Sequence, residues 1–94
     1  MNDIAVECSV AGGGWLAEVT VADSRSTRRF EVRVSTAELR RFAPEAADPA
    51  DLVRRSFEFL LAREPKESIL PVFDLSVIER YFPEFEREMG PRRG

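Results

Sequence analysis

The sequence has 94 residues, 44% of them hydrophobic and 33% charged, and its formal net charge is −3. A chain of this length forms one hydrophobic core rather than two, and its hydrophobic content is too high for a disordered chain. The negative net charge excludes a positive field over the whole surface, which binders of nucleic acids or anionic membranes use. We therefore expect one domain at residues 1–90 and a disordered tail at residues 91–94.

The cysteine content and the lengths of the apolar runs indicate the cellular compartment of the protein. Cys8 is the one cysteine, so we expect no internal disulfide, and the N-terminus lacks the charged and apolar regions of a signal peptide. No apolar run in the sequence approaches the roughly 20 residues that cross a bilayer. We expect a cytoplasmic protein without a membrane-spanning segment.

Three segments of alternating apolar and polar residues predict the strands of an antiparallel meander, at about 3–10, 15–22 and 28–35. Gly12 and Gly13 fit a two-residue turn between the first two strands, because glycine accepts the positive φ that such turns need. This turn sets Val10 opposite Trp15, so that the apolar residues of the two strands lie opposite one another on the same face of the sheet.

Charge decides our prediction for the register between the second and third strands. The first hairpin places Glu7 opposite Glu18 on the outer face, which is an unfavourable like-charge pair. Setting Val19 opposite Val32 also places Arg33 opposite Glu18, and this relieves the repulsion. The predicted sheet has one apolar face and one charged face.

Capping signals and apolar spacing predict two or three helices after the sheet, at about 36–43, 49–64 and 75–89, the last broken near Pro83. Ser35 and Glu38 form a capping box for the first helix. Asp48 and Asp74 are the expected N-caps of the other two. The middle helix carries a wide apolar arc that includes Phe57, and we expect it to cover the inner face of the sheet. The predicted fold class is α+β, with the helices packed on one face.

The sequence lacks the residues on which most catalytic and metal sites depend. It has no histidine, so it lacks the commonest general base and the commonest neutral metal ligand. One cysteine cannot anchor a zinc site, and Glu84, Glu86 and Glu88 are spaced so that they point around a helix rather than together. The glycines at 12–14 open no helix, unlike a phosphate-binding loop. We expect a protein that is not an enzyme and holds no cofactor and no metal.

An arginine-rich region offers an alternative function. Residues 23–43 contain six arginines and three acidic residues, a local excess of positive charge. Arginine side chains on an open face can contact phosphates, so this region is a candidate nucleic-acid interface. Against this, acidic residues share the sheet face, which has no aromatic side chain for base stacking. The candidate contacts are Arg25, Arg29, Arg33, Arg40 and Arg41.

The last helical region carries an apolar seam that has two interpretations. The seam either packs against the core, because few elements exist to form one, or it makes a homodimer contact with aromatic anchors. An uncovered first or third strand also invites a partner chain to add a strand. We predict a protein-interaction or accessory module whose partner is a second copy or another protein. The candidate interface residues are Phe82, Phe85 and Met89.

Between Ser56 and Glu86 the chain reads Ser-Phe-Glu-Phe-Leu-Leu-Ala-Arg-Glu-Pro, then Glu-Ser-Ile-Leu, then Phe-Asp-Leu-Ser-Val-Ile-Glu-Arg-Tyr-Phe-Pro-Glu-Phe-Glu. This third of the chain resembles a group of short prokaryotic proteins without an assigned function, so the resemblance implies a family and no catalytic residues. The order of three strands and a helix also resembles HicB-type antitoxins, which are small partner-binding proteins, at the level of fold alone. After the third strand this chain has a capping box and an arginine pair, where that family usually has a glycine-led acidic turn. Antitoxin activity is therefore not implied.

Overall fold

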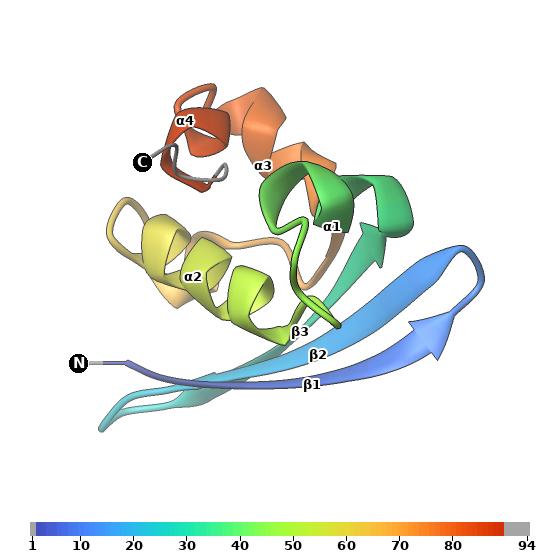
Figure 1. The fold of residues 1–94 in the computed structure, drawn as a ribbon. Helices are drawn as coiled ribbons and strands as arrows, with labels where there is room; N and C mark the ends of the chain where they lie inside the picture. The colour runs from blue at the N-terminus through green and yellow to red at the C-terminus, as the bar shows by residue number, and fades with distance from the viewer. Residues whose placement is uncertain (1, 90–94) are drawn as a thin grey trace.

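The computed structural model describes residues 2–89, which form one four-stranded sheet with a layer of helices on one of its faces (Figure 1). The strands, in sheet order, are β1 (Asp3–Ala11), β2 (Gly14–Ala22), β3 (Thr27–Ser35) and β4 (Val72–Asp74). The α-helices are α1 (Thr36–Phe42), α2 (Ala50–Leu61), α3 (Ser76–Tyr81) and α4 (Phe85–Met89), and a 3₁₀-helix spans Lys66–Ser68. The predicted α+β class and the three antiparallel strands are confirmed. The predicted tail at 91–94 lies outside the described residues.

The first hairpin has the predicted turn and register. Gly12 has a φ of 57° and is the first of the two turn residues, where a type II′ turn requires a positive φ. Val10 pairs with Trp15, and Glu7 pairs with Glu18 as expected. Because glycine adopts this φ without a steric penalty, the turn fixes how the two strands align.

The register between β2 and β3 differs from our prediction by two residues. Val19 pairs with Phe30 rather than with Val32, and Glu18 pairs with Glu31. The predicted relief of Glu18 by an arginine directly opposite it is therefore wrong. A shift of two residues keeps every side chain on its own face, so burial of the apolar row does not distinguish the two registers.

The connection between β2 and β3 explains the observed register. Oδ1 of Asp23 accepts hydrogen bonds from the N–H groups of Arg25 at 2.8 Å and of Ser26 at 3.0 Å. These bonds close a short turn, so that Ala22 pairs with Thr27. Such local turn bonds outweigh a solvent-exposed ion pair, which contributes little to stability.

A fourth strand, which we did not predict from the sequence, covers part of β3. β4 runs parallel to β3, with Phe73 paired to Val32. Asp74 is the last residue of this strand, so its predicted role as a helix cap is wrong, and Leu75 precedes α3 without a side-chain cap. Backbone groups at the edge of β3 need partners, and the segment after Pro71 supplies them.

The first helix begins at its predicted cap, whereas the caps of the later helices differ from the prediction. At the start of α1, the Glu38 N–H donates to Ser35 Oγ at 3.0 Å, and the Ser35 N–H donates to the Glu38 carboxylate at 2.8 Å. This is the predicted capping box. α2 is shorter than predicted and follows Pro49, but Oδ1 of Asp48 accepts a hydrogen bond from the Ala50 N–H at 2.9 Å. The N-cap residue is therefore Pro49, so the prediction of Asp48 as N-cap is wrong by one position, although the Asp48 carboxylate still accepts a bond from an N–H of the first turn.

Side chains from the sheet and from α2 form the centre of the core. Phe57 of α2 is fully buried. The centroid of its ring lies 5.1 Å from the ring centroid of Phe30 and 6.1 Å from that of Phe73. Leu60 is buried beside it. The prediction that the middle helix covers the apolar face of the sheet is confirmed.

α3 and α4 are separate helices, broken near Pro83 as predicted. α3 ends at Tyr81 and α4 begins at Phe85, so Pro83 lies in the turn and not in the first position of α4. The ring of Phe85 packs edge-on against Phe42 of α1 at 5.4 Å and against Phe59 of α2 at 5.3 Å. Phe85 therefore packs α4 against α1 and α2.

Candidate functional site

The predicted interface residues of the last helical region lie largely in the core. Phe85 is 0% exposed and Met89 is 9% exposed. Phe82 is half-buried, and its ring packs edge-on against Phe59 at 5.8 Å. The first of our two interpretations, packing within the chain, therefore describes Phe85 and Met89. In this structure Phe85 presents no surface to a partner and Met89 presents very little.

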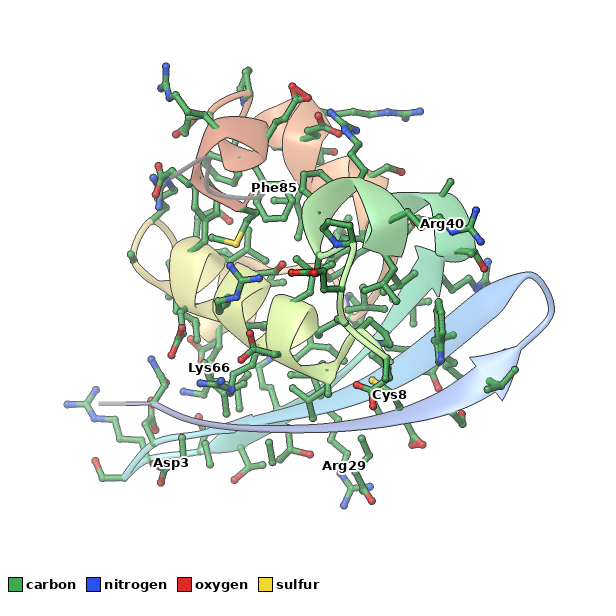
Figure 2. All side chains as sticks on the ribbon, in the orientation of Figure 1. Asp3, Cys8, Arg29, Arg40, Lys66 and Phe85 are labelled. Carbon is green, nitrogen blue, oxygen red and sulfur yellow. The ribbon has the colours of Figure 1, made fainter. Side chains whose placement is uncertain are left out.

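The arginine-rich region is distributed over different faces of the molecule. Arg29 projects from the open face of the sheet, whereas Arg40 projects from α1 in the helical layer (Figure 2). Arg33 shares the open face with Arg29, because alternate residues of a strand point to the same side. Arg25 lies in the connection between β2 and β3. The five candidate contacts therefore do not form one surface.

Two arginines are engaged by carboxylates that join helices to one another. Arg41 of α1 donates to Glu79 of α3 at 2.9 Å and also to Glu86 of α4. Its hydrogen bonds to Glu79 and then to Glu86 raise the pKa of Arg41. Arg63 follows α2 and donates to Glu88 of α4 at 2.9 Å. A phosphate would have to displace these carboxylates to bind either arginine.

The open face of the sheet carries a row of three exposed carboxylates. Glu7 pairs with Glu18, and Glu18 pairs in turn with Glu31. Arg29 and Arg33 flank the row on β3. Because the two signs alternate, this face presents no continuous positive field of the kind that attracts nucleic acid.

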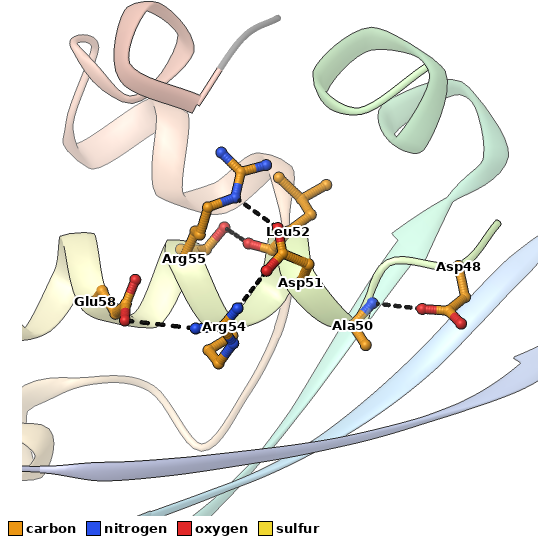
Figure 3. A network of polar contacts seen from close by, with 8 residues as sticks. Asp48, Ala50, Asp51, Leu52, Arg54, Arg55 and Glu58 are labelled. Atoms are coloured by element: carbon orange, nitrogen blue, oxygen red, sulfur yellow. Dashed lines mark hydrogen bonds and ion pairs between the residues drawn. The ribbon is translucent and has the colours of Figure 1, made fainter. Parts of the chain in front are cut away.

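The solvent face of α2 carries a network of ion pairs within the helix (Figure 3). Asp51 accepts hydrogen bonds from Arg54 and, at 3.0 Å, from Nε of Arg55. Arg54 also lies 3.8 Å from the carboxylate of Glu58. Pairs three and four residues apart on an exposed helix face stabilise the helix itself. We assign this network to support of α2 and not to a ligand.

The one lysine of the chain joins the β2–β3 connection to the segment after α2. Lys66 is 5% exposed, and its Nζ lies 2.5 Å from Oδ2 of Asp23 and 3.2 Å from Oε2 of Glu67. The hydrogen bond from Lys66, followed by those from two backbone N–H groups, holds the pKa of Asp23 well below its usual range. The bond to Asp23 also raises the pKa of Lys66. The ion pair of Lys66 and Asp23 therefore connects two segments whose residues are 43 positions apart in the chain.

An apolar pocket of about 260 Å³ lies between α2, α3 and the chain that follows α2. The residues with polar side chains that line it are Glu64, Ser68 and Tyr81. The volume lies below the roughly 300–1,000 Å³ of most small-molecule sites, and the polar groups are few. This pocket does not present the paired acid and base of a hydrolytic site.

β1 forms an edge of the sheet, and its inner face is incompletely covered. Among the described residues, β1 pairs with β2 alone. Ile4, Val6 and Cys8 are half-buried, whereas the residues opposite them on β2 are buried. Val10 is 81% exposed. α2 packs against β1 but covers this row only in part. The sequence pattern could not show this, because alternation marks a face and not its depth of burial.

The two edges of the sheet differ in how they are protected. β4 is a strand of three residues, and short edge strands offer little to pair with. β1 has nine residues, pairs with β2 without a bulge, and contains no proline, lysine or arginine. Its charged residues, Asp3 and Glu7, both point to the outer face. β1 therefore lacks the bulge, the proline, the lysine and the inward-pointing charge that often block an edge strand.

Cys8 lies in the half-buried row of β1. Burial, and then the nearby charge of Asp48, raise the pKa of its thiol. A thiol in this state behaves as a small apolar side chain. Cys8 is therefore part of the apolar row of the edge strand.

The described residues contain neither a group of potential metal ligands nor a helix suited to a membrane. Across residues 2–89, no three His, Cys, Asp or Glu side chains are grouped so that they could hold a metal ion. None of the described helices has the length and apolar character to cross a membrane.

Comparisons with protein-family models, with curated proteins and with solved structures found no match to this chain. The resemblances noted from the sequence stay predictions. The functional assignment therefore depends on the geometry of the molecule itself.

Proposed function

We propose that the chain is a non-catalytic protein-interaction module that binds an extended segment of a partner along the free edge of β1. The observation that carries this proposal is that β1 is a regular, unprotected edge strand whose inner row is only half covered. An edge strand has backbone N–H and C=O groups without partners, and an added strand satisfies them.

The register of the sheet assigns which backbone groups of β1 face the free edge. At the opposite edge, the Glu31 N–H donates to Pro71 O at 2.8 Å, and the Leu75 N–H donates to Arg33 O at 2.9 Å. The backbone N–H and C=O groups of odd-numbered residues in β3 therefore point toward β4, and those of even-numbered residues point toward β2. Even-numbered residues of β3 pair with odd-numbered residues of β2, so the backbone groups of even-numbered β2 residues point toward β1. These in turn pair with odd-numbered residues of β1, whose backbone groups therefore point toward β2. The residues whose backbone faces the free edge are Ile4, Val6, Cys8 and Val10.

The same residues of β1 supply the exposed backbone groups and a row of apolar side chains, half-buried at Ile4, Val6 and Cys8 and exposed at Val10. A bound strand would therefore gain hydrogen bonds and apolar contacts together. In strand addition the main-chain bonds give affinity, and the alternate side chains give specificity. The proposal needs no pocket and no ionisable catalytic group, in keeping with a sequence that has no histidine.

Replacing Val6 with proline is expected to abolish partner binding in a protein that still folds. Proline removes the edge-facing N–H of residue 6 and leaves the bonds to β2, which the odd-numbered residues make. Val6→Ala is the matched control, since it keeps the N–H of residue 6 and removes more side-chain atoms than Val6→Pro does. Immobilised wild type, Val6→Pro and Val6→Ala are compared for the proteins they retain from an extract of the native cell, with circular dichroism as the check of folding. A partner retained equally by all three folded proteins would place the contact away from β1.

A further inference from the structure

We infer that the strand bound at β1 belongs to a second copy of this chain, paired antiparallel about a two-fold axis at Cys8. The inference rests on the proposed function, because it names the partner that occupies the edge. In this arrangement the two sheets join into one continuous sheet, and both helical layers lie on the same side of it.

The edge of β1 is complementary to a copy of itself. In each copy the even-numbered residues direct their backbone groups to the edge, so an antiparallel pairing of even with even residues places donors opposite acceptors. A two-fold axis repeats each contact, as in most homodimers. The half-buried apolar rows also meet on the helical side, where each copy covers what the other leaves open.

Charge argues against the register in which all of β1 overlaps. That register has its axis at Glu7 and sets the carboxylates of the two copies directly opposite each other. It also extends the row of Glu7, Glu18 and Glu31 into the second copy. Moving the axis to Val6 removes this contact but leaves Val10 beyond the paired segment, in solvent.

An axis at Cys8 removes the repulsion and also covers Val10. Glu7 then lies opposite Ser9 of the second copy, whose hydroxyl is a donor for the carboxylate, and symmetry supplies this contact twice. Val10, the most exposed large apolar side chain of the described residues, lies opposite Val6 of the second copy. The half-buried row and the exposed end of the hairpin are thus buried in one step.

The arrangement brings two negatively charged chains together, because each copy carries a formal net charge of −3. Salt screens such repulsion, so dimerisation is expected to strengthen as ionic strength rises. Binding to phosphates would weaken instead, and the salt dependence therefore separates the two.

The first test measures the mass of the purified chain by analytical ultracentrifugation as its concentration is raised from low micromolar to near millimolar. Wild type is expected to pass from monomer to dimer, and Val10→Asp to weaken the dimer roughly tenfold or more, because a carboxylate replaces a buried valine. Val72→Asp is the matched control, since Val72 is also exposed but lies on β4 at the other edge. Equal weakening by both substitutions would overturn the assignment to β1.

The second test locates the axis by oxidative cross-linking of single-cysteine proteins. Diamide takes up the two electrons and two protons released when two thiols form a disulfide, and residues on the axis lie within disulfide reach. Wild type carries its cysteine at position 8. The comparison proteins carry Cys8→Ser with either Val6→Cys or Glu7→Cys. Fastest cross-linking through position 8 supports the inference, and fastest cross-linking through position 6 or 7 overturns the assigned axis.

The two tests also separate this inference from the proposed function. A chain that stays monomeric at every concentration overturns the second copy as the occupant. If that monomer still retains a cell protein that Val6→Pro loses and Val6→Ala keeps, the strand-binding function stands with another partner. A dimer that Val6→Pro and Val10→Asp leave unchanged also overturns the second copy as the occupant of β1. Equal retention of cell proteins by folded Val6→Pro and Val6→Ala overturns the proposed function.

Discussion

Replacing Gly14 with alanine is expected to lower the free energy of unfolding by about 2 kcal/mol or more, a far larger loss than the same change causes at Gly13. A Cβ atom at residue 14 would lie 2.1 Å from the carbonyl oxygen of Val34 and 2.8 Å from Cα of Ser35. Both are backbone atoms of the neighbouring strand, so they cannot move aside as a flexible side chain would. β2 and β3 approach each other so closely here that only glycine fits.

Gly13 is the matched control for this prediction. A Cβ atom there meets nothing within 4 Å, and its φ is not positive. We expect Gly13→Ala to change the free energy of unfolding by no more than about 0.5 kcal/mol. Urea unfolding with a common m value measures both variants. Equal losses would show that the hairpin end depends on turn flexibility and not on the close approach of β2 to β3.

Replacing Phe85 with alanine is expected to lower the free energy of unfolding by about 3–5 kcal/mol. Phe85 is fully buried against two aromatic rings, so truncation leaves a cavity between α4 and the helices beneath it. This loss is a large share of the stability of a small domain, which is about 5–15 kcal/mol. Thermal and urea unfolding measure it.

Two further variants make the result for Phe85 interpretable. Phe85→Leu fills most of the volume and should cost about 1 kcal/mol, which keeps the variant folded for comparison. Tyr81→Ala, at an exposed position of α3, should change stability by no more than about 0.5 kcal/mol. A dimer that dissociates in folded Phe85→Leu, without loss of monomer stability, would restore the interface role first considered for Phe85.

The first hairpin was predictable because two independent signals in the sequence agree. Alternation in both strands and the turn at Gly12 lead to the same register. The second connection offered only a charge argument, which favoured Arg33 opposite Glu18. The side chain of Asp23 decided the register instead through its bonds to backbone N–H groups, and an Asp followed by small polar residues is a recognisable turn signal.

β4 could not be predicted from periodicity. Three residues are too few for alternation to stand out, and their pairing partner is about forty positions earlier in the chain. Lys66 illustrates the same limit, because its burial depends on Asp23, which is far from it in sequence. Contacts of this kind follow from the path of the whole chain.

The candidate site was predictable in part. Strand alternation correctly placed Arg29 and Arg33 on the open face, but a stretch that is contiguous in sequence became divided between the sheet and α1. The free edge of β1 was among the surfaces considered, whereas β3, the other candidate edge, is covered by β4. How far the helical layer reaches over β1 depends on tertiary packing, and only the structure reveals that Val10 is uncovered.

Hydrogen exchange of individual amides in β1, measured as a function of protein concentration, tests the binding edge most directly. We expect the amides of Val6 and Cys8 to exchange rapidly in dilute protein and to become protected as concentration rises. The amides of Glu7 and Ser9, which face β2, should be protected throughout. Protection of Val6 and Cys8 that does not change with concentration, with no added partner present, would contradict pairing of β1 with a second copy.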